Sequence, residues 1–248
     1  MTSIATDFEN ELARFRTEHQ AAIQFFYAWQ SIYLVAENDK VAARLLNEAP
    51  LMWNTILGAL QTSALIALGR IFDRDKKSHS LDRLLSLSSG NLAIFSKEEF
   101  AVRKRAQSEL SALELKTYMD SVYVATPEDF RRLRLHVDKR RRIYKEKYAP
   151  LRHKVFAHRE MLDKSQVGEL FAKTNIKEMQ QLLTFLASLH EALWQLFFNG
   201  IKPSLRPTRF SAKRMLKQPS VKGRRGSVQE RLISEMQAFL TAHRRLRA

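Results

Sequence analysis

The stretch from residue 6 to residue 35, TDFENELARFRTEHQAAIQFFYAWQSIYLV, carries one long amphipathic pattern. Its apolar and aromatic residues recur at steps of three and four, which is the spacing of one face of an α-helix. They are Phe8, Leu12, Phe15, His19, Ala22, Phe26, Trp29 and Tyr33. Thr6 to Glu9 has the pattern of a capping box, which opens a helix. The stretch therefore predicts a long helix that ends near Val35 and faces a helical core.

The rest of the chain has the same helical character. Gly and Pro are few, 7 and 6 among 248 residues, and strand-like alternation is nearly absent. We expect helices at 41–46, 50–72, 81–85, 96–123, 126–148, from 150 onward, at 174–200 and at 228–245. The sequence predicts an all-α fold. A helical bundle at 1–200 is followed by a basic C-terminal extension at 201–248, which contains Pro and Gly and ends in an amphipathic helix.

The most apolar stretch, residues 51–72, is interrupted by polar residues. These are Asn54, Thr55, Gln61, Thr62, Ser63 and Arg70. The stretch is therefore interpreted as a buried helix of a soluble protein rather than a membrane span. The first 15 residues have acids where a signal peptide would have a basic and then an apolar region. Together with the absence of cysteine, this favours a cytoplasmic protein without disulfides or thiolate metal sites.

Charge is distributed unevenly along the chain, whose formal net charge is +16. Residues 1–200 carry 29 Lys and Arg against 24 Asp and Glu, whereas residues 201–248 carry 13 against 2. This excess favours a polyanionic partner, with nucleic acid first and an anionic membrane surface second. The simpler alternative is a tail that only keeps the protein soluble.

Residues 151–160, LRHKVFAHRE, combine the groups that RNA cleavage without a metal needs. Arg152 can hold a phosphate, and His158 can move protons near pH 7. A histidine that takes the proton of the ribose 2′-OH lets that oxygen attack the adjacent phosphorus, a reaction that DNA cannot undergo. His153 is expected to orient one of these groups or to contact the phosphate.

The helical position of this motif decides how its groups can meet. Pro150 is expected to break the preceding helix and to place Arg152 in the first turn of a new one, where free backbone N–H groups favour an anion. His158 would lie about 120° around the helix from Arg152, since each residue turns an α-helix by about 100°. Either the helix is irregular or two copies of the chain complete one site. Spacing alone also permits His158 to be an ordinary core or rim residue.

Several further basic residues are candidates for contact with nucleic acid. They lie in the motif, on the helix before it and in the tail: Lys154, Arg159, Arg131, Arg134, Arg142, Lys145, Arg224 and Arg225. The alternative for the basic helix is an ordinary solvated surface. Arg70 and Asp73, one turn apart, predict an ion pair at a helix end. No acid stands at helical ligand spacing from His153 and His158, so no metal site is predicted.

The order of Arg152, the polar His153 and then His158 resembles the signature of the HEPN superfamily. The string LRHKVFAHRE is similar to the abortive-infection, AbiU-like branch of that superfamily, as are residues 67–73, ALGRIFD, and residues 80–85, SLDRLL. The similarity covers roughly residues 7–200. The resemblance implies a HEPN-like helical bundle that forms a homodimer and cleaves RNA without a metal or any other cofactor, in a toxin or phage-defence system.

The resemblance also implies roles for single residues. Arg152 and His158 would be catalytic, and His153 would assist them. The expected partners are RNA, a second copy of the chain and a candidate antitoxin or other defence-system protein, with no membrane. Some members of the superfamily are inert, so a non-catalytic nucleic-acid-binding or oligomerisation module stays open as the alternative.

Overall fold

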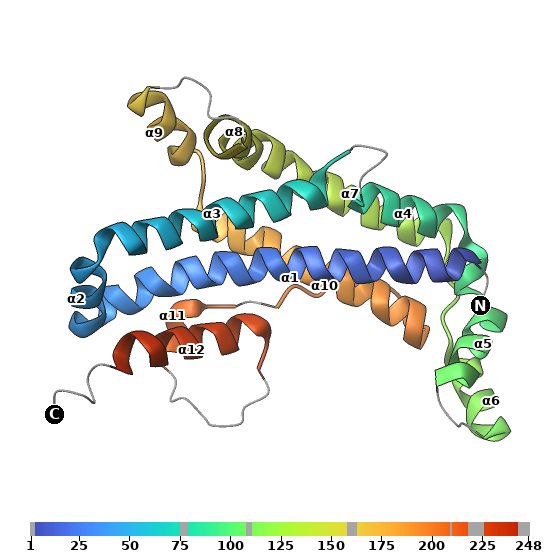
Figure 1. The fold of residues 1–248 in the computed structure, drawn as a ribbon. Coiled ribbons are helices and arrows are strands. Elements are labelled where there is room, and N and C mark those ends of the chain that lie inside the picture. Colours follow the sequence, from blue (N-terminus) through green and yellow to red (C-terminus); the bar gives the residue numbers. More distant parts are fainter. Residues whose placement is uncertain are drawn as a thin grey trace.

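The fold is a bundle of helices, seen in a computed structural model that describes residues 3–74, 79–107, 111–157, 163–208, 210–217 and 226–242. At its centre is the long helix α1 (Ser3–Asn38), with α3 (Pro50–Phe72) along one side of it and α10 (Ile176–Asn199) behind it (Figure 1). Every regular element within these residues is helical, which confirms the predicted all-α fold.

Shorter elements complete the bundle. α2 (Lys40–Glu48) links α1 to α3, and α4 (Leu81–Gly90) packs against α7 (Pro127–Ile143). The others are a 3-10 helix, η1 (Leu92–Phe95), two π-helices, η2 (Tyr144–Tyr148) and η3 (Arg152–Ala157), and the α-helices α5 (Lys97–Gln107), α6 (Ala112–Ser121), α8 (Ala149–Leu151), α9 (Lys164–Ala172), α11 (Ala212–Leu216) and α12 (Val228–Thr241).

The stripe predicted on α1 forms much of the core. Its buried members are Phe8, Leu12, Phe15, His19, Ala22 and Phe26. Two details of the prediction are wrong. The helix begins at Ser3, so Thr6 lies inside it rather than capping it, and Tyr33 is 50% exposed. Near its end the buried face shifts to Ile32 and Val35, because residues of α2, α3 and α12 cover that side of α1.

The helix expected over residues 96–123 is divided into two helices, α5 and α6. The hydroxyl of Ser96 accepts the backbone N–H of Glu99 (3.3 Å) and so caps the start of α5. A second capping box then opens α6. The hydroxyl of Ser111 accepts the N–H of Glu114 (3.3 Å), and the Glu114 carboxylate accepts the N–H of Ser111 (2.9 Å). This local signal competes with helix continuation, and the prediction of one helix did not take it into account.

Residues beyond Gly200 contribute to the core, although they were expected to lie outside it. Ala212 on α11 and Ile233 on α12 are buried in the main core. Leu240 on α12 is completely buried in a second apolar cluster with Trp53 and Leu57 of α3. α12 packs against α1 and α2 (Figure 1). Its apolar face therefore joins the C-terminal part of the described chain to the two N-terminal helices.

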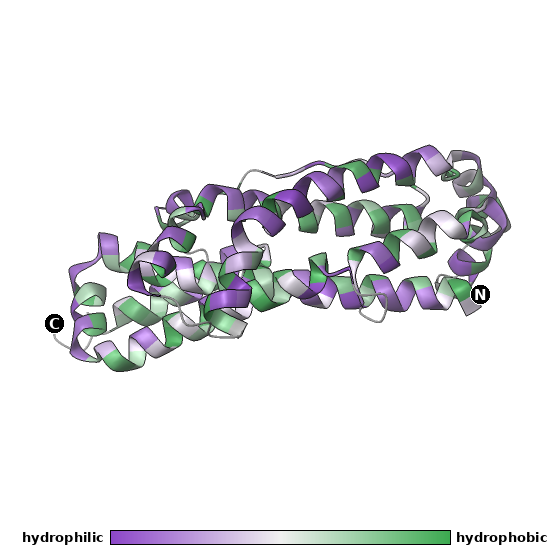
Figure 2. Ribbon diagram, turned by 90° about the horizontal axis from the view of Figure 1, so that it is seen from above, coloured by the Kyte–Doolittle hydropathy of each residue, from purple (hydrophilic) through white to green (hydrophobic). Residues whose placement is uncertain are grey.

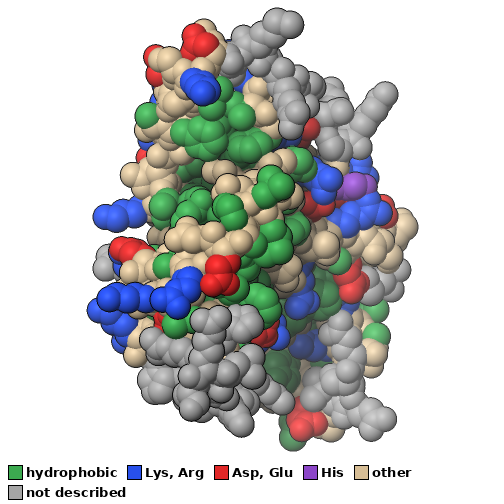
Figure 3. Space-filling view, turned by 60° about the vertical axis from the view of Figure 1, so that its left-hand side comes forward, with side chains coloured by type: hydrophobic (Ala, Val, Ile, Leu, Met, Phe, Trp, Pro, Cys, Tyr) green, Lys and Arg blue, Asp and Glu red, His purple; other side chains and the backbone are tan. Residues whose placement is uncertain are grey.

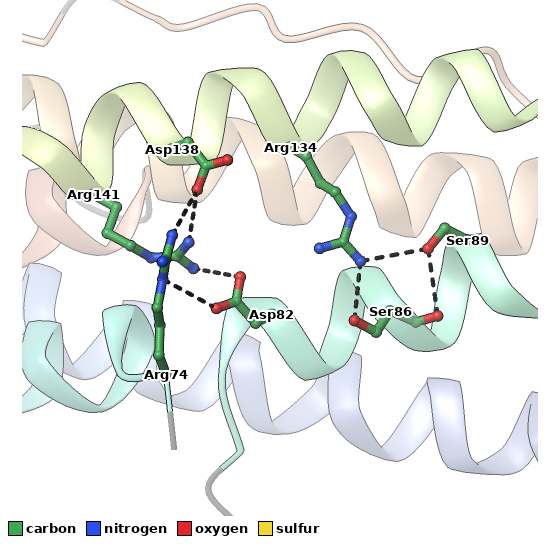
Figure 4. Close-up of polar contacts among 7 residues, drawn as sticks. All are labelled: Arg74, Asp82, Ser86, Ser89, Arg134, Asp138 and Arg141. Carbon is green, nitrogen blue, oxygen red and sulfur yellow. Dashed lines mark hydrogen bonds and ion pairs between the residues drawn. The ribbon is translucent and has the colours of Figure 1, made fainter. Parts of the chain in front are cut away.

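An ion-pair network fastens α4 to α7 (Figure 4). The guanidinium of Arg141 on α7 is buried and donates to Asp82 of α4 (2.7 Å) and to Asp138 of its own helix (2.8 Å). Arg74, which follows α3, pairs with the same two carboxylates at 3.7 and 3.4 Å. The network therefore fixes the chain after α3 to both α4 and α7.

α3 is the one helix within the described ranges that is long and apolar enough to cross a membrane. In the fold, 44% of its most apolar window is buried. Its buried residues include Trp53, Leu57, Leu65 and Leu68, which pack in the two core clusters. Figure 2 shows hydrophobic and hydrophilic residues alternating along the helices, as expected where one side of each helix is buried.

Two buried histidines predict that the stability of the fold depends on pH. The rings of His19 (α1) and His190 (α10) lie 5.1 Å apart. Burial lowers the pKa of His19 to about 4 and that of His190 to about 3, from 6.5. The unfolded chain therefore binds more protons below about pH 6.5, and stability should be lost as the pH falls from 6.5 towards these folded-state values.

Thermal unfolding between about pH 6.5 and about pH 5 measures this effect, in a range where most carboxylates stay ionised. His19→Gln keeps a donor for the carbonyl of Phe15, to which the ring now bonds at 2.9 Å. This variant should show a clearly smaller loss of stability on acidification than the wild type. His136→Gln, at an exposed histidine, is the matched control and should behave like the wild type. Equal acid sensitivity of all three proteins would contradict the prediction.

Candidate active site around Arg152

The helix that leads to Arg152 does not break at Pro150, contrary to the sequence-based prediction. α7 continues through η2, α8 and η3 to Ala157. The N–H of Ala149 donates to the carbonyl of Tyr144, five residues back, which is the wide turn of a π-helix. Proline has no N–H and its ring crowds the turn before it, and the wider turn accommodates both. Arg152 therefore lies inside a helical run, and its own N–H donates to Ala149.

This geometry corrects the expectation that free backbone N–H groups around Arg152 would hold an anion. What remains for that task is the guanidinium itself. The sequence left two ways for the motif groups to meet, an irregular helix or a second copy of the chain. The helix is irregular at the motif, because η3 is a π-helix. The other catalytic candidate, His158, lies outside the described residues.

The side chain of Arg152 lies across α3 at Gly69. A Cβ placed on Gly69 would stand 2.8 Å from Cζ and 2.9 Å from Cδ of Arg152, closer than any real side chain allows. Gly69 is buried inside the helix, where glycine costs about 1 kcal/mol relative to alanine. The close approach of the arginine explains this glycine, which lies in the predicted family motif at 67–73 and had no expected role of its own.

Tyr144 forms the inner wall of the site. Its ring is 4% exposed and stacks on Phe72 of α3, with centroids 5.2 Å apart. Burial raises the pKa of Tyr144 to about 12, with Arg152 opposing the rise and Asp73 adding to it. The phenol is therefore a neutral donor. Its hydroxyl and the Nε of Arg152 are both buried without a hydrogen-bond partner in the described part of the chain.

His153 stands on the solvent side of Arg152. Its Nε2 lies 2.8 Å from Nη2 of Arg152, and its side chain is exposed. A guanidinium can only donate, so this Nε2 accepts and the neutral ring carries its proton on Nδ1. Arg152 is thus held between Gly69 on the inside and His153 on the outside. The structure therefore brings together two of the predicted site residues, Arg152 and His153.

The predicted nucleic-acid-binding residues do not form one cluster. Lys154, Arg142 and Lys145 are exposed within three turns of Arg152. Arg131 and Arg134 lie about 27 Å or more from Arg152 along the same helical run, at about 1.5 Å per residue. There Arg131 pairs with Glu128, and Arg134 donates to Ser86 (3.0 Å) and Ser89 (3.4 Å) on α4 (Figure 4). Arg159, Arg224 and Arg225 fall outside the described residues.

Comparison with known proteins places the chain by its sequence. The family model HEPN_AbiU2, described as AbiU2, matches residues 5–218. The match begins in the first turn of α1 and runs past α11, so it includes Gly69, Tyr144, Arg152 and His153. It extends beyond Gly200, where the similarity inferred from the sequence alone was expected to end. No curated protein and no solved structure matches the chain.

Proposed function

This chain belongs to the AbiU2 family of HEPN proteins, and from that premise we propose that it is a metal-independent endoribonuclease of a toxin or phage-defence system. The observation that carries the proposal is the placement of Arg152. Its guanidinium lies across Gly69, next to a neutral tyrosine and under an exposed histidine. A fixed cation of this kind stabilises the charge that builds up on a phosphoryl group during cleavage.

The proposed reaction needs only groups of the protein and the RNA. His158 takes the proton of a ribose 2′-OH, and the 2′-oxygen attacks the adjacent phosphorus. The bond from phosphorus to the 5′-oxygen breaks, and that oxygen receives a proton from a histidine or from water. Arg152 stabilises the phosphoryl oxygens, and His153 keeps its guanidinium in place. The products are a 2′,3′-cyclic phosphate and a free 5′-hydroxyl.

We propose that the active protein is a homodimer, so that groups from two copies line one cleft. An apolar surface supports this proposal, and Figure 3 shows apolar side chains gathered across one face of the molecule. Trp29 and the exposed Tyr33 pack edge to face beside a pocket lined by Leu151 and by Ile176, itself 48% exposed. Leu151 directly precedes Arg152, so a copy docked here would adjoin the motif. An antitoxin or another defence protein is a further candidate partner, and the cytoplasm is the proposed location.

Cleavage of RNA in excess chelator tests the proposed chemistry. The wild-type protein should still cut RNA and leave 2′,3′-cyclic phosphate and 5′-hydroxyl ends. The same RNA with a 2′-deoxy sugar at the cut position should stay intact there, because the attacking hydroxyl is missing. The His158→Ala protein serves as the control and should bind RNA without cutting it. Products with 5′-phosphate ends, or cleavage that requires a divalent metal, would rule out this reaction.

One observation favours the alternative of a non-catalytic nucleic-acid-binding or oligomerisation module. The Nε of Arg152 is buried, so the side chain also ties η3 to α3 and has a structural use whether or not RNA is cut. The same assay separates the two functions. If the protein is a module of this kind, the wild type and His158→Ala would bind RNA equally well, and neither would cut it.

A further inference from the structure

A second polar cluster lies where α1 passes the start of α4. Its centre is Glu11 of α1, which is 6% exposed. One carboxylate oxygen of Glu11, Oε1, accepts Nδ1–H of His79 (2.8 Å) and Nε–H of Arg83 (2.8 Å). Arg14, one turn along α1, contacts Nε2 of the same histidine. Three segments of the chain thus bring one guanidinium group and an imidazole to a buried carboxylate, and a second guanidinium group to that imidazole.

The cluster has more positive charge than its own ion pairs require. One cation would neutralise Glu11, yet Arg14 and Arg83 are both present. The neighbouring acid, Glu18, already pairs with Arg70 (3.4 Å), which replaces the expected pair of Arg70 with Asp73. Arg83 uses its Nε for Glu11, and its terminal nitrogens have no hydrogen-bond partner among the described residues. The surplus charge is therefore available to an anion.

These cations are accessible from solvent. The side chains of His79 and Arg83 are 47% and 48% exposed, although the carboxylate that orients them is buried. Arg14, Arg70 and His79 line an open pocket of about 280 Å³ together with Glu11 and Glu18. Arg83 lines a second open pocket beside it. A buried anchor with outward-facing donors is the arrangement of a built anion site, because the donors are held in place before the ligand arrives. An ion pair that served only stability would need neither the second arginine nor the open pocket.

The position of this pocket relates it to Arg152. Gly69, which lies against the Arg152 guanidinium, is followed directly by Arg70 and Ile71, which line the pocket. Consecutive Cα atoms are about 3.8 Å apart, so the C-terminal end of α3 separates the two places by the width of one helix. A strand of RNA that crosses this helix end can reach both.

We propose that Arg14, His79 and Arg83 form a subsite that binds a backbone phosphate of the RNA, away from the linkage that is cut. Glu11 is the positioning residue. It holds the Nδ1–H of His79 and the Nε–H of Arg83. Nε2 of the imidazole then accepts from Arg14, and the terminal nitrogens of Arg83 face the strand. The inference rests on RNA being the substrate of the Arg152 site. The class of ligand is single-stranded RNA that extends past the linkage that is cut.

Binding of an uncleavable RNA tests the subsite without relying on cleavage. The probe is a fully 2′-O-methylated single-stranded oligonucleotide, and affinity is measured over a series of salt concentrations. The double variant Arg14→Gln/Arg83→Gln should bind about 10-fold more weakly and reduce the slope of log affinity against log salt by about 0.7 for each phosphate that it no longer binds. His79→Gln should weaken binding less, and it leaves both arginines in place. Arg16→Gln, at an exposed position on the same helix, should bind like the wild type.

Thermal unfolding shows whether each variant is folded. If the double variant does not fold, His79→Gln still tests the subsite, because this side chain is half-exposed and glutamine can still donate to Glu11. The subsite is overturned if the folded variants of the cluster bind with the affinity and salt slope of Arg16→Gln. It is also overturned if the wild type does not bind the probe. If the subsite variants lose affinity while the wild type cuts no RNA, the proposed reaction fails and the subsite stands.

Discussion

Gly69→Ala should lower the rate of RNA cleavage by about 100- to 1,000-fold, the loss expected when one fixed donor to the reacting phosphoryl group is displaced. The added methyl group would occupy the space of Cζ and Cδ of Arg152, so the guanidinium must leave its place between α3 and His153. Alanine is otherwise favourable inside a helix, by about 1 kcal/mol over glycine. The variant should therefore stay folded, which circular dichroism and thermal unfolding can verify while single-turnover cleavage reports the rate.

Gly58→Ala supplies the matched control, because Gly58 lies on the same helix and has no atom within 4 Å of the position of a new Cβ. This protein should cut RNA at the wild-type rate and unfold at an equal or higher temperature. Arg152→Ala should resemble Gly69→Ala in rate. If Gly69→Ala cleaved RNA like the wild type, the placement of Arg152 across α3 would have no part in the reaction.

Arg141→Ala should reduce the free energy of unfolding by about 3 kcal/mol, since each hydrogen bond to a charged group contributes about 1.5–3 kcal/mol. The change removes both bonds of the buried guanidinium and leaves Asp82 and Asp138 facing each other with only Arg74 between them (Figure 4). Denaturant titration measures the loss.

The neighbouring residue provides the control for this prediction. Arg142 is exposed, and replacing it by alanine should change the free energy of unfolding by less than about 0.5 kcal/mol. Arg141→Met adds a further comparison, because an apolar side chain of similar volume avoids a cavity and should cost less than alanine. Equal stability of Arg141→Ala and Arg142→Ala would show that the network does not hold α4 against α7.

Much of the fold could be predicted because the signals for a helix are local. The three-and-four spacing on α1, Pro50 at the start of α3 and Asn175 before α10 each depend on neighbouring residues alone. The family motif also led to Arg152 and His153, which the structure brings within hydrogen-bond distance. These features require no knowledge of which helices pack together.

The missed features depend on contacts between distant segments. Tyr144 had no predicted part in the site, and only the wide turns of η2 and η3 place it beside Arg152 and Phe72. Glu11 and His79 are 68 residues apart, and no local pattern links them. Gly69 offered a usable signal, since a glycine within an apolar helix often marks a close approach of another segment. The sequence could not say which side chain would approach.

The packing of α12 on α1 has a consequence for the order of events during synthesis. α1 leaves the ribosome before the other described helices, but Ile32 and Val35 stay uncovered on one side until Leu240 of α12 arrives. At about 5–20 residues per second, this interval lasts on the order of 10–40 s. The nascent bundle therefore stays incomplete throughout this interval. The arrangement delays completion of the apolar interior until nearly the whole described chain has been made.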